Sequence, residues 1–318
     1  MTVDTAAPAP VLRPDWTPSF LKSMRQESDD EADAVADEIL ARGGAPLVNR
    51  AWRLMLSRAA ILNDPELAQC PKLQAYLGAA PFLPNGVDYP RLLHGQLFFA
   101  TWGPLIALGL LTNSLPSSYA AANGVRVIAM TGRLETDTNR RIRETAQILI
   151  DALEPHGLDP ENAAARGFTT VRHVRLMHAY IRRLLETGYW ATEGRNVSGW
   201  RRVRAPFYRP SQGAWNRVAW GRPINQEDLA GTLMSFAYLP IVSVRKGPDP
   251  DWVDQQGVEA WIYAWTIVGQ LLGVDDRLLP RSEAEARELY ELIAHDEHKG
   301  SPQGRSMTRA LVRELEMR

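Results

Sequence analysis

Helical periodicity over most of the chain is the feature that most constrains its fold. Segments rich in Ala, Leu, Arg and Glu repeat at helical spacing and are separated by short turns of Pro, Gly, Asn and Asp. Residues 225–228 and 282–285 have the spacing of capping boxes, which mark the starts of helices. The sequence contains no hairpin dipeptide between alternating strands and no strand–helix–strand rhythm. It therefore predicts an all-α, multi-helix fold in a single domain.

The composition divides the chain into three parts. Residues 1–28 form a Pro- and Ala-rich arm that is expected to be disordered, 29–300 form the helical domain, and 301–318 form a C-terminal helix. Within the domain, 190–223 is a predicted loop that combines four tryptophans and seven arginines with a single glutamate. Long loops in compact domains are uncommon and often functional. We interpret this one either as a lid over a site or as an insertion held to the surface by its tryptophans.

Charge and cysteine content exclude several classes of function. The formal net charge of -1 gives no whole-chain electrostatic support for a nucleic-acid partner. Cys70 is the single cysteine, which excludes intramolecular disulfides, cysteine-based zinc sites and iron–sulfur clusters. The N-terminus lacks the pattern of a signal peptide, and the most apolar stretch, 92–111, is expected to break as a helix at 102–104, so no transmembrane segment is predicted. These features predict a cytoplasmic protein and leave its oligomeric state open.

A histidine lies on the apolar face of the predicted helix 171–185. At about 100° per residue, four apolar side chains lie within about 60° of His178: Val171, Val174, Ile181 and Leu185. Arg175 and Arg182 fall together on one flank of this face. A neutral imidazole in an apolar wall suits haem iron, and two guanidinium groups could pair with haem propionates. The alternative is a packed core histidine whose neighbouring arginines pair with acids elsewhere in the chain.

Two further histidines lie near the C-terminus. His295 and His298 flank Asp296 and Glu297, and this spacing is compatible with a surface metal site. Because the segment lies close to a polar chain end, we expect a solvated helix terminus instead.

Several segments resemble the latex-clearing-protein (rubber oxygenase) and MpaB-type oxygenase family. Residues 174–182 resemble the family signature Arg-x-x-His-x-x-x-Arg, and 131–134 (TGRL), 220–228 (WGRPINQED) and 261–274 (WIYAWTIVGQLLGV) resemble further family segments in the same order. The resemblance implies a helical fold with a globin-like core that binds haem b. It implies that His178 is the iron ligand and that Arg175 and Arg182 belong to the cofactor-binding signature.

The resemblance also implies which residues lie on the distal side of the haem. Residues 141–145 resemble the family's Arg-x-x-x-Thr element, which implies that Arg141 and Thr145 stabilise iron-bound dioxygen by hydrogen bonds. The alternative for this pair is a first helical turn packed in polar contacts. Where the family has a lysine that can ligate iron, this chain has Glu144, so the distal site is expected to be open, water-bound or differently gated. Glu144 is a candidate acid or base, with simple solvent exposure as the alternative.

The leading hypothesis is therefore a haem-b-dependent oxygenase that acts on a small hydrophobic or specialised-metabolite substrate with dioxygen. The alternatives are a haem peroxidase, a haem-dependent dehydrating or cyclising enzyme, and a non-catalytic haem-binding or helical interaction protein. Phe236 and Trp265 are candidates for the pocket lining, and ordinary core packing is the other interpretation of both.

Overall fold

The computed structural model describes residues 16–54, 57–79, 82–130, 138–187, 214–247 and 252–316. Apart from one isolated bridge between Ala121 and His298, every regular element of these residues is a helix, which confirms the all-α prediction. The α-helices in chain order are α1 (Pro18–Met24), α2 (Asp30–Leu54), α3 (Arg58–Leu62), α4 (Pro71–Gly78), α5 (Tyr89–Gly109), α6 (Leu115–Ala120), α7 (Ala122–Met130), α8 (Thr138–Leu153), α9 (Gly167–Thr187), α11 (Arg217–Trp220), α12 (Gln226–Ala237), α13 (Leu239–Val244), α14 (Gln255–Leu271), α15 (Glu283–Glu297) and α16 (Pro302–Glu316).

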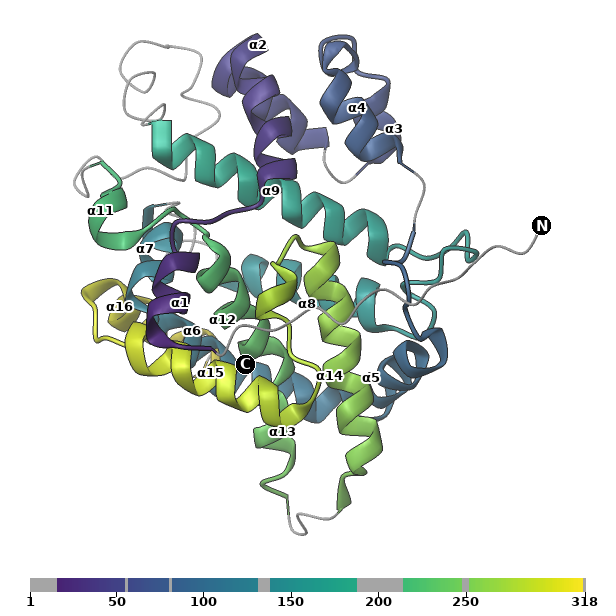
Figure 1. Cartoon of the computed structure of the whole chain (residues 1–318), viewed down its shortest axis with the longest axis vertical. Coiled ribbons are helices and arrows are strands. Elements are labelled where there is room, and N and C mark those ends of the chain that lie inside the picture. The colour runs from purple at the N-terminus through teal and green to yellow at the C-terminus, as the bar shows by residue number, and fades with distance from the viewer. Residues whose placement is uncertain are drawn as a thin grey trace.

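Helix α9 lies between two hydrophobic cores. Figure 1 shows α9 crossing the molecule, with α2, α3 and α4 on one side and α5, α8, α12 and α14 on the other. Phe168 and Val171 of α9 belong to the larger core. Leu176, Tyr180 and Leu184, on another face of the same helix, belong to the smaller core with α2 and α4. Because both cores use α9, the position of this helix decides how the two halves of the molecule meet.

Helices α5 and α14 pack along each other at the centre of the larger core. Gly95 of α5 permits their close approach, since a Cβ atom at this position would lie 2.2 Å from the carbonyl oxygen of Ala260. Trp261 of α14 is fully buried and stacks on Phe99 of α5, with 5.9 Å between the ring centroids. The indole N–H of Trp261 donates to the carbonyl oxygen of Ala237 at 2.7 Å, so this large side chain is satisfied both by packing and by hydrogen bonding.

The prediction that the helix breaks at 102–104 is wrong. Helix α5 continues through Pro104, and a π-helical turn, η2 (Leu110–Ser114), joins it to α6. Proline removes one backbone hydrogen bond and crowds the preceding turn. Pro104 and Ala100, one turn earlier, are both exposed, so solvent can reach the backbone group that the missing bond releases.

By length and composition, the helical stretch Tyr89–Ala120 could cross a membrane, and it is the one such helix in the part of the chain that the structure describes. This differs from the expectation that no such segment exists. One side of the stretch packs against α13 and α14, as a core helix does. On another side, Leu97 and Leu108 are 49% and 54% exposed. The stretch is thus a core helix that carries an apolar face at the surface.

The N-terminal region is more ordered than its composition predicts. Part of the arm expected over 1–28 forms α1, where the Thr17 side chain caps the helix by accepting from the N–H of Phe20 at 3.2 Å. Leu21 and Met24 of this helix are buried in the larger core. Burial of these two apolar side chains supplies the free energy that a short isolated helix lacks.

Both predicted capping sites begin helices. The side chain of Asn225 accepts from the N–H of Asp228 at 2.9 Å, and the Asp228 carboxylate accepts from the N–H of Asn225 at 3.2 Å, which confirms the capping box at α12. At α15, the Ser282 hydroxyl accepts from the N–H of Glu285 at 3.2 Å. These local bonds fix where the two helices start.

A buried ion pair joins α9 to α2. The guanidinium group of Arg182 is fully buried and pairs with Asp33 of α2. The same group donates from Nη2 to the carbonyl oxygen of Ile224 at 2.8 Å. Asp33 also accepts from Nη2 of Arg222 at 3.0 Å. Removal of these charges from water is costly, and the dense set of hydrogen bonds offsets that cost.

Two further pairs flank the Arg182–Asp33 pair along the same two helices. Asp29 receives two hydrogen bonds from Arg175, at 2.5 and 2.7 Å. Asp37 receives two from Arg183, at 2.6 and 2.8 Å. Asp29, Asp33 and Asp37 are four residues apart and therefore lie on one side of α2. We call this row of pairs the α2–α9 ion ladder.

The ladder predicts an uneven response to the loss of its arginines. R182M should lower the free energy of unfolding by about 3 kcal/mol or more, because it leaves Asp33 buried with part of its charge uncompensated. R183M should cost less than about 1 kcal/mol, because its partner Asp37 is 47% exposed and its second partner, Glu186, keeps its pair with Arg222. Urea unfolding followed by circular dichroism measures both changes. Equal losses in the two variants would contradict a special role for the buried pair.

Candidate functional site

His178 lies in the middle of α9, on a face that is half-buried, whereas the faces turned to the two cores are buried. Its Nδ1 atom is buried, whereas the residue as a whole is half-buried, as are Val174 and Ile181 on the same face. Ile181 packs against the apolar cluster that contains Val127 of α7. The structure thus places an imidazole in a half-buried apolar wall, as the helical pattern predicts.

The structure gives Arg175 and Arg182 other partners than the predicted haem propionates. Arg175 is held by Asp29 and, at 2.8 Å from Nη2, by Glu31. Arg182 is held by Asp33 and by the carbonyl oxygens of residues 223 and 224. The reason is that the acidic start of α2 lies alongside α9 and already supplies the anions. In this structure both arginines pair with acids elsewhere in the chain, as in the alternative interpretation, and their predicted part in cofactor binding stays a prediction.

Thr145 of α8 lines an apolar cavity of about 130 Å³ between α5, η2, α6, α8 and α12. Six large apolar side chains form most of its wall: Leu110, Leu111, Leu115, Ile142, Leu149 and Phe236. Trp265 lies behind Phe236, with 5.6 Å between the ring centroids. The prediction that Phe236 lines a pocket is therefore confirmed, whereas Trp265 contributes to the core behind it.

Two serines of the cavity wall, Ser114 and Ser118, were not identified from the sequence. The available signal was a run without any Asp, Glu, Lys or Arg from 92 to 125, in which these hydroxyl groups are four residues apart. By composition alone, that run resembles a membrane span. The cavity that it lines together with residues of α8 and α12 identifies it as a pocket wall.

Several predicted site residues lie outside the described part of the chain. The backbone of Arg141 and Glu144 belongs to α8, but their side chains are not described. The spacing of four residues still places Arg141 on the same helix face as Thr145. The segment 131–134 and most of the Trp- and Arg-rich loop, 188–213, also lie outside the described residues. The roles predicted for these residues stay predictions.

The described residues fit a haem in their donor chemistry. A histidine nitrogen is the commonest protein ligand of haem iron, and His178 presents one from a half-buried apolar wall. Helix α8, which carries Thr145, is a direct neighbour of α9. The fit does not extend to the propionates, because Arg175 and Arg182 are engaged by α2.

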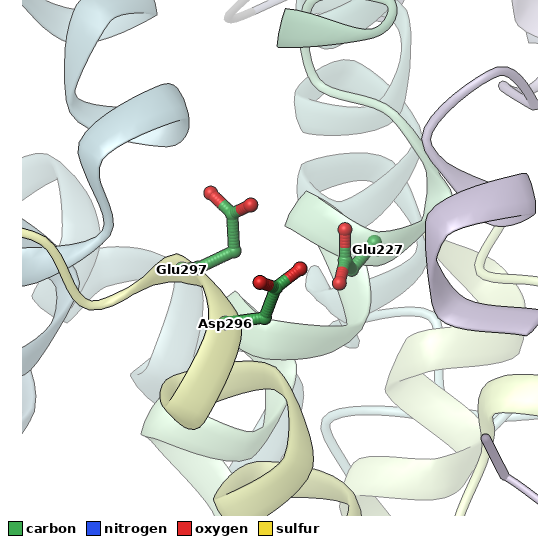
Figure 2. A group of neighbouring side chains, drawn as sticks. All are labelled: Glu227, Asp296 and Glu297. Atoms are coloured by element: carbon green, nitrogen blue, oxygen red, sulfur yellow. The ribbon is translucent and has the colours of Figure 1, made fainter. Parts of the chain in front are cut away.

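Three carboxylates gather where α12 meets the end of α15 (Figure 2): Glu227, Asp296 and Glu297, with ligand atoms within 4.8 Å of one another. The guanidinium group of Arg25 pairs with all three, at 2.8 Å in the case of Glu297. Asn123 of α7 donates to Glu297 at 3.1 Å. The cluster therefore already contains a cation from the protein itself. The helix end that was expected to be solvated is so only in part: the Asp296 side chain is 45% exposed, whereas Glu297 is 4% exposed.

This carboxylate cluster predicts a pH-dependent stability. Burial raises the pKa of Glu227 from 4.5 to about 7, against the opposing effect of Arg25. Between these two pKa values, the folded protein holds a proton on Glu227 that the unfolded chain releases. The contribution of this proton to the free energy of unfolding is therefore fully present below about pH 4.5 and is lost as the pH rises through 7. Between pH 8 and pH 5, proton uptake by Glu227 should therefore raise the melting temperature of the wild type relative to that of E227Q. The buried His173, whose pKa is lowered to about 4, removes stability over the same range to the same extent in both proteins.

Thermal unfolding at pH 5, 6, 7 and 8 measures this slope, and the exposed Glu31 supplies a control in E31Q. The same slope in wild type and E227Q would show that Glu227 does not take up the proton. The comparison stops at pH 5 because the lowered pKa values of carboxyls such as Asp64 and Asp296 reverse the trend in stronger acid.

Comparisons with known proteins place the chain among oxygenases. Residues 93–318 match the family described as "ER-bound oxygenase mpaB/B'/Rubber oxygenase, catalytic domain". The chain is 24% identical over 341 residues to a rubber oxygenase of Streptomyces sp. (strain K30), with 96% of this chain and 70% of that protein covered. Its fold resembles the structure of latex clearing protein LCP in the closed state, with a TM-score of 0.67, 21% sequence identity, and 95% of this chain and 75% of that chain covered.

Proposed function

The chain belongs to the family of mpaB/B' and rubber oxygenase catalytic domains, whose members are oxygenases, and on this premise we propose that it uses haem b to oxidise a small hydrophobic or specialised-metabolite substrate with dioxygen. The observation that carries the proposal is the position of His178. The family signature and the helix geometry single out the same residue, and the structure places it in a half-buried apolar wall next to α8. When bound, haem supplies the activation of dioxygen, which no amino-acid side chain provides.

His178 would hold the haem iron through its imidazole, and the neighbouring arginines would act on it indirectly. Arg175 and Arg182 fix α9 against α2 through the α2–α9 ion ladder. They are positioning residues in this proposal, since their bonds to described residues go to α2 and to the carbonyl oxygens of residues 223 and 224. This arrangement fixes the part of α9 from which the imidazole extends.

On the distal side, the residues of α8 provide hydrogen bonds in an apolar space. The hydroxyl group of Thr145 can donate to negative charge that develops on the reacting oxygen atoms, and Arg141 on the same helix face can add a cation. Glu144 occupies the position of the family's lysine, and a carboxyl group there can accept or donate a proton. The apolar wall with Leu110, Leu111 and Phe236 excludes water and suits a hydrophobic substrate.

The iron-ligand assignment predicts that H178A loses its haem. Protein purified after haem-replete expression should show a Soret band in the wild type, and this band should be absent or strongly shifted in H178A. His173 of the same helix provides the matched control. It is buried, its pKa is lowered to about 4 by desolvation, and its Nε2 has no hydrogen-bond partner among the described residues. H173L therefore removes no charge and no hydrogen bond, and should keep the Soret band.

A wild-type protein that takes up no haem would end the proposal. A Soret band in H178A equal to that of the wild type would leave haem in place and exclude His178 as the iron ligand.

The distal assignment predicts that T145V keeps its haem and loses activity. Valine has nearly the shape of threonine, so the apolar cavity should remain, while the hydroxyl donor is lost. We expect substrate-dependent dioxygen consumption to fall about 100-fold, which is the usual effect of removing one donor to a developing charge. The Soret absorbance serves as the control for cofactor content. Unchanged oxygen consumption would assign Thr145 to packing alone.

A further inference from the structure

A π-helical turn forms part of the cavity wall. Residues 110–114 form η2, and the N–H of Leu115 donates to the carbonyl oxygen of Leu110 five residues earlier. Such turns are rare and are frequent at functional sites. Leu110, Leu111 and Ser114 of η2 all line the cavity that also contains Thr145. A ligand in this cavity would therefore contact the π-helical turn.

The hydroxyl group of Ser114 is buried and has no hydrogen-bond partner among the residues that the structure describes. Ser114 is 1% exposed. Nearby hydroxyl groups satisfy themselves on the backbone: Thr112 donates to the carbonyl oxygen of Leu108 at 2.8 Å, and Ser118 donates to that of Ser114 at 2.9 Å. Ser114 lacks this bond although it belongs to the same helical stretch. An unpaired buried hydroxyl group destabilises a protein, and Ser114, unlike the buried His173, lines a cavity in which a ligand can supply the missing partner.

The rest of the cavity restricts what that partner can be. Among the described lining residues there is no Asp, Glu, Lys or Arg. Ala107 of α5 and Ala146 of α8 line the cavity and are exposed, so the cavity opens to the surface between these two helices. The described wall therefore suits an uncharged, mainly apolar molecule, because a charged one would lose its hydration without gaining an ion pair from these residues.

We propose that Ser114 is the polar anchor of this cavity and selects an uncharged, mainly apolar substrate that carries one hydroxyl or carbonyl group at its buried end. A pure hydrocarbon of the same shape would leave the Ser114 hydroxyl unpaired, and a site built around a hydrogen bond discriminates against such an analogue. The identification of this ligand as the substrate rests on the proposed oxygenase function. The binding preference itself requires only the cavity and Ser114.

Phenol and toluene test the preference, because they have nearly the same shape and differ in one hydroxyl group. The cavity volume of about 130 Å³ is close to that of engineered cavities that bind benzene. Isothermal titration calorimetry gives both dissociation constants for the wild type, S114A and S118A, each in the haem-loaded and the haem-free protein. We expect S114A to weaken phenol binding about 3- to 10-fold relative to toluene. S118A is the matched control and should keep the wild-type ratio, because the Ser118 hydroxyl is already bonded to the backbone.

The stability of S114A without any ligand gives a second measurement. Removal of a hydroxyl group that has no partner should leave the melting temperature unchanged or raise it. A marked decrease would reveal a structural partner of Ser114 and overturn the proposal. A wild type that binds neither probe, or an S114A ratio equal to that of the wild type, would overturn it as well. The Soret band of H178A is a separate measurement, so failure of the anchor and failure of the haem assignment are distinguishable.

Discussion

The buried pair between Arg182 and Asp33 is the interaction on which the arrangement of the site depends. The guanidinium group of Arg182 is fully buried in this pair. Its removal from water costs free energy, which only a well-aligned ion pair with additional hydrogen bonds can offset. Arg175 and Arg183 bind Asp29 and Asp37 on either side of it, so all three pairs form together only in one register of α9 along α2. We infer that the ladder specifies where α9 lies more than it adds to stability. The position of His178 is determined by that register.

The same principle recurs at Arg25. Its guanidinium group lies among Glu227, Asp296 and Glu297 and ties α1 to α12 and to the end of α15. Arg25 pairs with three carboxylates and Arg182 with one, and in both places the partners come from elements that are distant in sequence. Arginine suits this task because its planar group offers several donors in fixed directions. Both networks contact the start of α12, since Glu227 lies in its first turn and the carbonyl group that Arg182 binds directly precedes its cap, Asn225.

The apolar cavity has a different origin, in the uncharged stretch from α5 to α6. One face of α5 packs on α14 through the close contact at Gly95, and the helix then passes through Pro104 without a break. The π-turn that follows places Leu110, Leu111 and Ser114 opposite Thr145 of α8. A stretch that looks in isolation like a membrane span thereby forms a core helix and the wall of a pocket. His178 and the cavity-lining Thr145 come from α9 and α8, which pack directly on each other.

The sequence by itself determined the features that depend on the local period of the chain. Helical spacing predicted the all-α fold, the capping box at Asn225 and the placement of His178 in an apolar arc, because these follow from residues three or four positions apart. Tertiary structure alone decided which anions satisfy Arg175 and Arg182, that Glu297 is buried, and that Ser114 lines a cavity with no hydrogen-bond partner for its hydroxyl group in the described part of the chain. The partners of a charge and the walls of a cavity depend on which helix faces meet, and these faces come from segments that are far apart in sequence, 271 residues in the case of Arg25 and Asp296.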